Sequence, residues 1–232
     1  MTYTDWTVFQ PYILQLEQEG KVTRTFRRLD PERQLAVLNA ILDEAADRGP
    51  ATLNIKEIAR RANVSVGSLY QYFPNRDGML DFAIELCLRF SIGVFKEYQP
   101  VLAAMPIKEA LNAYLMGGLE WGQVATGLVR FFGRAAYQGD PDLAERVVRP
   151  IATVMRETIH EILAQAAARG EIRPDLDLEA AVRIVNSLTI VISDSQLLPY
   201  LNTYLQVSDE SVPPKQIMGA LVEFILHGIS VE

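Results

Sequence analysis

Residues 54–76 read NIKEIARRANVSVGSLYQYFPNR, and this stretch decides the fold. Asn54 is a suitable N-cap, and the apolar residues behind it recur at helical spacing: Ile55, Ile58, Ala59 and Ala62. Asn63 can adopt the left-handed conformation that a tight reversal requires. Ser65 is a second N-cap candidate, and Pro74 ends the helix that follows it. The stretch therefore predicts two short helices joined by a turn, the arrangement in which one helix supports another that enters the major groove of DNA.

The second of these helices is expected to have a buried side and an exposed side. Val66, Leu69 and Phe73 follow one another at i, i+3 and i+7, which predicts an inward stripe. The outward side includes Gln71, which can form two hydrogen bonds with adenine, and Ser68, which can bond to a base or a phosphate. This side therefore has the chemistry to read a base sequence.

Other residues of the stretch are suited to the phosphate backbone. Gly67 lets the backbone come close to a duplex, and Tyr70 and Tyr72 have hydroxyls suited to phosphate oxygens. Four cations against the single acid Glu57 give a positive balance: Lys56, Arg60, Arg61 and Arg76. The candidate DNA-binding residues are Asn54, Lys56, Ser65, Val66, Gly67, Ser68, Tyr70, Gln71, Tyr72 and Arg76.

The same stretch resembles the signature of the TetR family of transcriptional regulators, which is usually seen as IA..AGVS.G.LY.HF..K. The matching residues are Ile58-Ala59, Ala62-Asn63-Val64-Ser65, Gly67-Ser68-Leu69-Tyr70, Tyr72-Phe73 and Arg76. Asn63 replaces the usual glycine and Arg76 the usual lysine, and both preserve the physical role. Tyr72 replaces histidine. Val66 stands where a basic or small residue is common, and it removes a phosphate contact.

The resemblance implies an all-α fold in three parts. Residues 1–29 form an N-terminal extension, residues 30–76 a three-helix helix-turn-helix DNA-binding domain, and residues 77–232 a helical effector-binding and dimerisation domain reached through a long helix. A second local match lies far along the chain, where residues 168–177 resemble the connection before the penultimate helix of many family members. The two matches together predict that the family fold extends over both parts of the chain.

The extension contains a predicted helix and a run of cations. Pro11 suits a first helical turn and Gly20 a stop, while Trp6 and Phe9 are expected to pack on the effector domain or a partner subunit. The cations that follow have no acid between them: Lys21, Arg24, Arg27 and Arg28. This run is either a solvated linker, which we favour, or an arm laid along phosphates or into a minor groove.

Prolines mark the ends of the predicted body helices. A long helix from Asp77 is expected to close before Pro100, since the residue before a proline disfavours helical geometry. Asp140-Pro141 starts a helix that continues to about Gly170, and Pro150 should kink it.

Composition narrows the class of protein further. The chain has 232 residues, 49% of them hydrophobic, and a net charge of −7, so any DNA contact must be confined to a local basic patch on an acidic body. The single cysteine, Cys87, lies in an apolar setting and is interpreted as a buried small residue. No apolar run approaches the length of a membrane span, and no leader pattern is seen, which predicts a cytoplasmic protein with no membrane partner.

A regulator of this type needs a cavity for a small-molecule effector, and aromatic, methionine and polar side chains of the body are candidates to line it. They are Met116, Trp121, Phe131, Phe132, Tyr137, Met155, Asn186, Thr189, Ser193 and Asp194. Ordinary core packing is the alternative for each of them. The shortage of cations along these helices favours an apolar or neutral effector.

The last two predicted helices are candidates for a homodimer interface. The resemblance implies that they pack against their copies in a four-helix arrangement, and ordinary core helices are the alternative. The residues predicted for dimerisation are Ile184, Leu188, Val191, Ile217, Leu221, Phe224 and Ile225. Two reading helices about one DNA turn apart, roughly 34 Å, would then read a palindromic operator.

Nothing in the sequence predicts catalysis, a cofactor or a metal. His160-Glu161 begins like a helical zinc-protease motif, but Ala164 stands where the second histidine belongs, and His227 is the only other histidine. The leading interpretation is a ligand-responsive repressor released from its operator by a small-molecule effector. The alternative is an all-α enzyme or small-molecule carrier whose helix-turn-helix is architectural, and a third interpretation is an interaction scaffold.

Overall fold

The structure is a computed structural model that describes residues 6–49, 52–124, 126–137 and 140–231, without the side chains of residues 121–126. Every regular element in these ranges is a helix, and an isolated antiparallel bridge joins Ile172 to Ser230. The predicted all-α fold is confirmed. Within the same ranges, no helix has both the length and the apolar character needed to cross a membrane.

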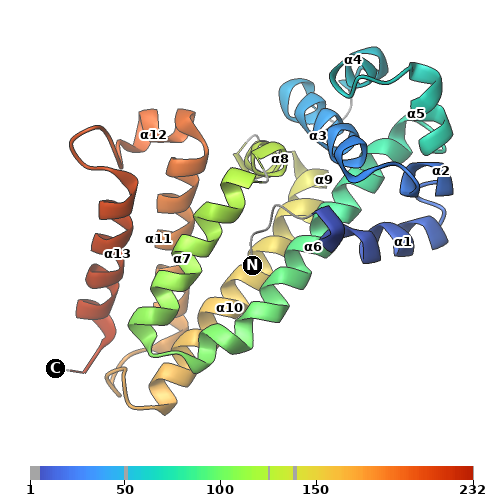
Figure 1. The fold of residues 1–232 in the computed structure, drawn as a ribbon. Coiled ribbons are helices and arrows are strands. Elements are labelled where there is room, and N and C mark those ends of the chain that lie inside the picture. The colour runs from blue at the N-terminus through green and yellow to red at the C-terminus, as the bar shows by residue number, and fades with distance from the viewer. Residues whose placement is uncertain (1–5, 50–51, 125, 138–139, 232) are drawn as a thin grey trace. The chain divides into compact units, whose positions relative to one another are not determined.

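The helices follow one another along the described part of the chain (Figure 1). The first seven elements are the 3₁₀ helix η1 (Trp6–Phe9), α1 (Gln10–Gln18), α2 (Arg24–Arg27), α3 (Pro31–Arg48), α4 (Ile55–Arg61), α5 (Val66–Tyr72) and α6 (Arg76–Ala104). The remainder are α7 (Ile107–Val124), α8 (Thr126–Tyr137), α9 (Pro141–Leu143), the π-helical segment η3 (Ala144–Val148), α10 (Arg149–Ala168), α11 (Leu178–Leu197), α12 (Pro199–Leu205) and α13 (Pro214–Ile229).

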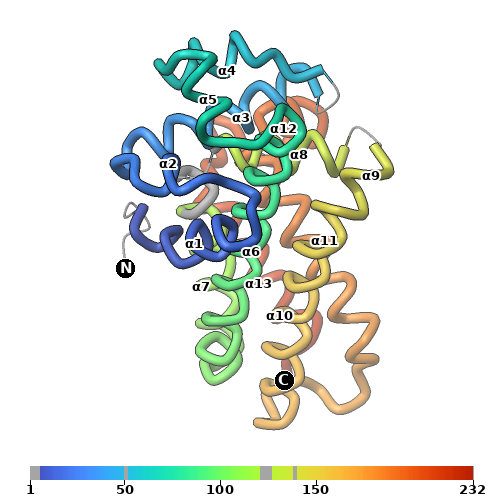
Figure 2. The backbone as a smooth tube through the Cα atoms, turned by 90° about the vertical axis from the view of Figure 1, so that its right-hand side faces the viewer, coloured from blue at the N-terminus to red at the C-terminus, as the bar shows by residue number. Residues whose placement is uncertain are grey.

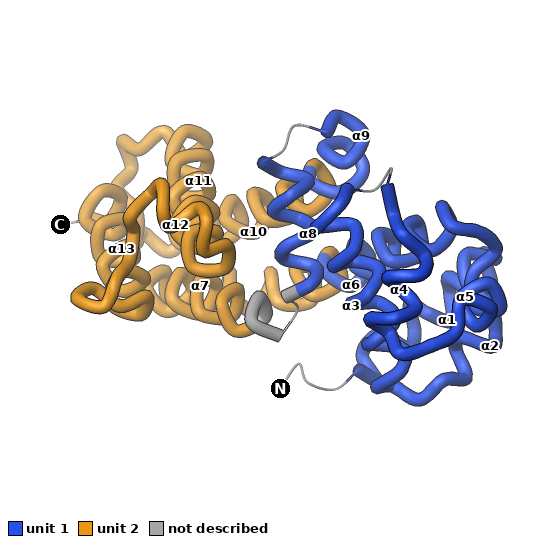
Figure 3. The backbone as a smooth tube through the Cα atoms, turned by 90° about the horizontal axis from the view of Figure 1, so that it is seen from above, with its two compact units in different colours: residues 1–91, 124–148 blue, residues 92–123, 149–232 orange. Residues whose placement is uncertain are grey.

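The chain divides into two compact units, coloured separately in Figure 3. Unit 1 comprises residues 1–91 and 124–148, and unit 2 comprises residues 92–123 and 149–232. Helix α6 begins in unit 1 and ends in unit 2. The predicted ranges 1–29, 30–76 and 77–232 divide the chain by function instead, and they stay predictions.

The N-terminal extension is an integral part of unit 1. Trp6 is buried and donates from its indole nitrogen to Oε1 of Gln34 at 2.5 Å, while its ring stacks on that of Phe9. Phe9 in turn stacks on Phe90 of α6, with ring centroids 4.1 Å apart. These aromatic residues therefore pack on α3 and α6 of unit 1.

The favoured interpretation of residues 21–28 as a solvated linker is wrong. Part of that segment is the helix α2, and its residue Phe26 is fully buried.

Two prolines act differently from one another. Helix α6 continues through Pro100 to Ala104, so its predicted end before Pro100 is wrong. The long helix is held by its other turns although Pro100 lacks the N–H that would bond to the preceding turn. Pro150 is the second residue of α10, and the five residues that precede this helix form η3, a segment with π-type hydrogen bonds. The single helix predicted from Pro141 is thus interrupted just ahead of Pro150.

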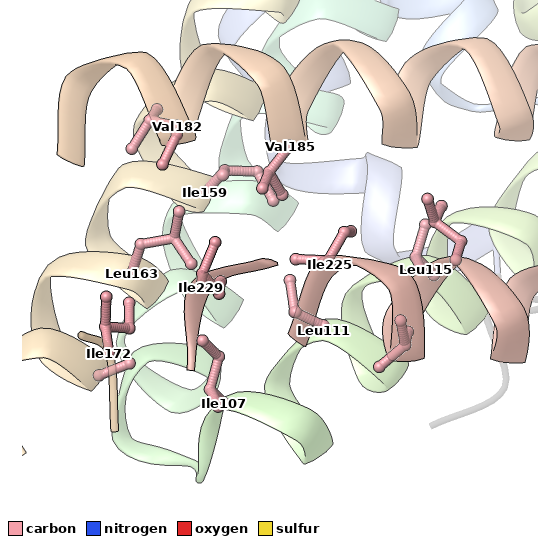
Figure 4. Packing of buried hydrophobic residues seen from close by; sticks show 14 of the residues in the cluster. Ile107, Leu111, Leu115, Ile159, Leu163, Ile172, Val182, Val185, Ile225 and Ile229 are labelled. Carbon is pink, nitrogen blue, oxygen red and sulfur yellow. The ribbon is translucent and has the colours of Figure 1, made fainter. Parts of the chain in front are cut away.

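Unit 2 has one main apolar core, and Figure 4 shows most of its members. Leu111 and Leu115 of α7 meet Ile159 and Leu163 of α10, with 2% exposure or less for each. Helices α11 and α13 complete this core with Val182, Val185, Leu221, Val222 and Ile225. Burying one such side chain contributes about 1.5–3 kcal/mol, so this core is the main source of stability for unit 2.

The connection before α11 closes unit 2 at one end. Arg169 donates to the carbonyls of Ala103 and Met105 at 2.8 and 2.7 Å, and Glu171 accepts from the backbone nitrogen of Ile107 at 2.7 Å. Carbonyls at the end of one helix and amides at the start of the next lack partners within their own helices. Residues 169–171 therefore cap the end of α6 and the start of α7, and Gly170 turns the chain with a φ of 76°.

Candidate DNA-reading surface

Helix α5 has one buried side and one exposed side. Leu69 and Phe73 are fully buried, whereas Tyr70 is 51% exposed and Gln71 and Gly67 are also exposed. The predicted inward positions of Leu69 and Phe73 agree with this burial. The described residues of unit 1 leave Gly67, Tyr70 and Gln71 exposed, so this side of α5 has space to reach a duplex.

Both short helices begin at the predicted caps. The side chain of Asn54 accepts from the backbone nitrogens of Lys56 and Glu57 at 3.1 and 3.3 Å. Ser65 accepts from the backbone nitrogen of Ser68 at 3.0 Å. Between the helices Asn63 has a φ of 53°, the left-handed conformation that the sequence predicts. These caps and this turn fix α5 against α4.

The cap at Ser65 also fixes the side chain of a predicted base-reading residue. The hydroxyls of Ser65 and Ser68 lie 2.8 Å apart and share a hydrogen bond. Ser65 therefore stabilises the start of α5. The side chain of Ser68 is partly buried and already forms a hydrogen bond with the hydroxyl of Ser65. Its predicted contact with a base or a phosphate remains a prediction.

Two residues of α5 differ from their expected positions. Val66 is 36% exposed and so does not extend the buried stripe, because it is the first residue of the helix and the stripe begins with Leu69. Tyr72 is buried with 7% exposure, since its ring packs edge-on against Phe26, with centroids 5.9 Å apart. The ring of Tyr72 is thus part of the core of unit 1. The phosphate contact predicted for its hydroxyl stays a prediction.

The positive balance of the stretch is smaller than the sequence indicates. Arg60 donates two hydrogen bonds to Glu57, at 2.9 and 2.6 Å, and Arg61 donates to the same carboxylate at 3.0 Å. The bonds from Arg60 and then from Arg61 lower the pKa of Glu57 to about 2. Arg61 also pairs with Asp47 of α3 at 3.0 Å. Lys56 is exposed on α4 and Arg76 is half-buried in the first turn of α6.

A buried carboxylate joins α3 to the start of α4. Glu44 is fully buried and accepts from the backbone nitrogen of Asn54 at 3.2 Å. Arg48 and Arg61 lie 3.1 and 3.4 Å from its two carboxylate oxygens. Because a buried charge must be paired, Glu44 fixes the position of α4 and of the cap at Asn54.

The sequence did not predict the parts played by Thr23 and Gln34. Thr23 donates from its hydroxyl to the carbonyl of Gln71 at 2.7 Å and from its backbone nitrogen to that of Tyr72 at 2.9 Å. Gln34 is fully buried and donates to the carbonyls of Phe26 and Arg27. A threonine before a short helical turn is a weak N-cap signal, but its long-range partners have no signal in a single sequence.

The residues predicted for an effector cavity fall in both units. Phe131, Phe132 and Tyr137 belong to unit 1, where Phe131 is fully buried and Tyr137 is 47% exposed. The others belong to unit 2: Met116, Met155, Asn186, Thr189, Ser193 and Asp194. The side chain of Trp121 lies outside the described residues. The cavity therefore stays a prediction.

Two polar atoms inside unit 2 have no hydrogen-bond partner among the described residues. They are the hydroxyl of Tyr114 and Oδ1 of Asn186. Burial raises the pKa of the Tyr114 hydroxyl, which keeps it neutral. Thr189, by contrast, donates to the carbonyl of Asn186 at 2.9 Å and is buried, so it is satisfied within its own helix. Asn186 is thus a predicted effector residue with a buried polar atom that lacks a partner among the described residues.

The residues predicted for dimerisation separate into two groups. Leu221 and Ile225 are buried in the core of a single chain, and Leu188 and Ile217 are partly buried. Exposed members lie on both of the last long helices: Ile184 at 61% and Val191 at 40% on α11, and Phe224 at 70% on α13. These three exposed members leave the most apolar surface for a second subunit among the predicted residues.

The two histidines have ordinary surroundings. His160 lies 3.4 Å from Glu179, and His227 lies 2.7 Å from the carbonyl of Glu223 through Nδ1. Among the described residues there is no group of three or more His, Cys, Asp or Glu side chains that could hold a metal ion. Cys87 is buried as predicted, and burial raises its pKa to about 12, so its thiol stays protonated.

A capped pair of short helices with an exposed polar side on the second helix defines a helix-turn-helix protein that contacts duplex DNA. The model of bacterial regulatory proteins of the TetR family matches residues 37–82, and that of the tetracyclin repressor-like C-terminal domain matches residues 117–191. Together they match more than half of the chain. The chain belongs to the TetR family and is a DNA-binding transcriptional regulator.

Named relatives and solved structures agree with this family. The transcriptional repressor KstR2 of Mycolicibacterium smegmatis is 28% identical over 63% of this chain and 70% of its own length. The repressor KstR of Mycobacterium tuberculosis is 28% identical over 78% of this chain and 76% of its own length. The structure of the ketosteroid transcriptional regulator KstR2 of Mycobacterium tuberculosis has a TM-score of 0.61 at 20% identity, over 88% of this chain and 98% of that one.

Proposed function

We propose that the chain is a ligand-responsive repressor that binds a palindromic operator as a homodimer and is released by a small-molecule effector. The observation that carries the proposal is the two-sided helix α5, with Leu69 and Phe73 fully buried and Gln71 exposed. A cytoplasmic location belongs to the same proposal, because the chain must reach DNA. No catalytic step is assigned to it.

Repression is favoured over activation by the named relatives. KstR2 and KstR are both described as transcriptional repressors, and each matches more than two thirds of its own length. A bound repressor acts by occupying DNA, so it needs a reading surface and a means of release. The effector proposed here is apolar or neutral, in line with the relative described as a ketosteroid regulator.

Exposed apolar residues on α11 and α13 support the homodimer. Ile184, Val191 and Phe224 are exposed apolar side chains, and contact with a second copy of the chain would remove them from water. Phe224→Asp should shift the chain to a monomer in light-scattering measurements of molar mass, because a charge would be buried against an apolar partner. Tyr204→Asp, on the 83% exposed residue of α12, is the matched control and should leave the dimer intact.

Release by the effector requires that DNA and effector affect each other's affinity. Helix α6 is a continuous element from Arg76, beside the reading helix, to Ala104 in unit 2, and movement of this helix would change the separation of the two reading helices. The coupling is reciprocal, so an effector that weakens DNA binding tenfold must itself bind tenfold more weakly to the DNA complex.

A thermodynamic cycle tests the proposal. Operator affinity is measured by fluorescence anisotropy with and without a ketosteroid or a fatty acid, and the affinity for each compound is measured by calorimetry with and without operator. For a true effector, the factor by which the compound changes operator affinity should equal the factor by which operator changes the affinity for the compound. If operator binding is tight but no apolar compound of a broad panel changes it, release by such an effector is excluded.

The alternative, an enzyme or carrier with an architectural helix-turn-helix, predicts a different result in a simple test. A DNA-binding chain with net charge −7 should be retained on immobilised random duplex at low salt and elute as salt is raised. An acidic enzyme or carrier would flow through. The variant Gln71→Ala with Arg76→Ala should elute earlier than the wild-type chain.

A further inference from the structure

Residues 22–28 are attached to the C-terminal end of α5, the helix proposed to read DNA. The hydroxyl of Thr23 donates to the carbonyl of Gln71 at 2.7 Å, and its backbone nitrogen donates to the carbonyl of Tyr72 at 2.9 Å. Carbonyls in the last turn of a helix have no partner within the helix, so Thr23 caps α5 from outside. Figures 1 and 2 both show α2 beside α5.

Packing holds this segment in place from its other side. Phe26 is fully buried, with its ring centroid 5.5 Å from that of Phe73 and 5.0 Å from that of Phe82. Gln34 of α3 donates to the carbonyls of Phe26 and Arg27 at 3.1 and 3.0 Å. The cations of this segment therefore have fixed backbone positions relative to α5 and do not belong to a free arm.

The three arginines of the segment differ in their partners. Arg27 forms an ion pair with Glu17 of α1. Arg24 and Arg28 are exposed four residues apart, and neither forms an ion pair among the residues that the structure describes. On α4, in contrast, Arg60 and Arg61 are both paired with Glu57. Arg24 and Arg28 are therefore available for DNA phosphates, as is the exposed Lys56 of α4, whereas Arg60 and Arg61 are already paired.

We infer that Arg24 and Arg28 bind phosphates of the duplex beside the groove that α5 occupies. Arg24 follows Thr23 directly, about 3.8 Å away between Cα atoms, and Arg28 lies about 6 Å further along a helical path, so both start within side-chain reach of the end of α5. When a helix lies in the major groove, phosphate backbones flank it on both sides. The inference rests on DNA reading by α5 and adds a second contact element to it.

The salt dependence of binding tests the inference. The wild-type chain, Arg24→Ala with Arg28→Ala, and Arg24→Lys with Arg28→Lys are titrated onto a selected operator and onto random duplex at several salt concentrations. Loss of two phosphate contacts should flatten the slope of log K against log salt by about 1.8 for each chain bound, equally on both duplexes. The lysine variant keeps the charges and should keep most of the slope.

Two controls separate this effect from a general change of charge or fold. Lys215→Ala removes an exposed cation from α13 in unit 2 and should leave the slope unchanged. Thermal unfolding followed by circular dichroism should give the same midpoint for the alanine variant and the wild type, since both arginines are exposed.

The outcomes are distinguishable. An unchanged slope in the alanine variant with operator affinity intact would overturn the inference and leave operator reading by α5 in place. A loss on operator alone would also overturn it, because phosphate contacts do not depend on sequence. Failure of the wild-type chain to bind any duplex would overturn the proposed function and this inference together.

Discussion

Arg130 of α8 donates from Nη2 to Oδ1 of Asp47, near the end of α3, at 2.6 Å. The other oxygen of this carboxylate accepts from Arg61 of α4 at 3.0 Å. Burial raises the pKa of Asp47, but its bonds and charge interactions with Arg61 and Arg130 outweigh burial and leave the pKa below its usual value. A single carboxylate thus joins the first helix of the helix-turn-helix to a helix from the later part of the chain.

Asp47→Asn should weaken this junction. Exposed or half-exposed ion pairs contribute about 0.2–1 kcal/mol each, so the free energy of unfolding should fall by about 1 kcal/mol in urea titrations. Asp175→Asn is the matched control, because Asp175 forms only a 3.7 Å pair with Arg173 and is 76% exposed. Equal stability of the two variants would show that Asp47 does not stabilise unit 1.

The contribution of Glu57 to the free energy of unfolding should depend on pH in a defined range. Its pKa is lowered from 4.5 to about 2 in the folded chain, so its contribution is complete above about pH 4.5 and is lost as pH falls towards 2. The difference in urea midpoint between wild type and Glu57→Gln should therefore shrink between pH 6 and pH 3. Other carboxylates titrate in both proteins and cancel. A difference that is constant over this range would contradict the assigned ion pairs.

Gln71 and Arg76 should affect binding in different ways. Gln71→Ala is expected to cost about 1–3 kcal/mol on the selected operator and little on random duplex, because it removes a base contact. Arg76→Ala should weaken binding to both duplexes and reduce the salt slope by about 1. Gel-shift titrations at several salt concentrations measure both effects. The two roles are wrong if the variants show the same ratio of operator to random affinity.

Gly67 tests how closely the backbone of α5 approaches a duplex. A Cβ at this position would lie 3.6 Å from Oγ of Ser65, an ordinary contact, and the backbone has no left-handed φ. Gly67→Ala should therefore leave the fold stable, or stabilise it by about 0.5–1 kcal/mol. Operator affinity should nevertheless fall, by tenfold for each 1.4 kcal/mol or so of lost contact. Unchanged affinity would show that this turn of α5 stays clear of DNA.

Local sequence signals predicted the structure of the helix-turn-helix well. Asn54, Ser65 and Asn63 act through hydrogen bonds or backbone conformations within a few residues, and the structure contains each of them as predicted. The burial of Leu69 and Phe73 followed from helical periodicity for the same reason.

Long-range pairings were beyond a single sequence. Thr23 contacts the carbonyl of Gln71, 48 positions away, and Arg130 contacts Asp47, 83 positions away. The charge balance around α4 was overestimated because Arg61 also pairs with Glu44 and Asp47 of α3, which lie outside the stretch. For the same reason the sequence could not separate buried Leu221 from exposed Phe224 on α13.

Selection of bound sites from a pool of random duplexes tests whether α5 reads DNA twice in each assembly. We expect enrichment of a palindrome whose half-sites have centres about 34 Å apart or a multiple of it, and loss of that enrichment with Gln71→Ala. Enrichment of a single unrepeated site, or of no sequence at all, would contradict it.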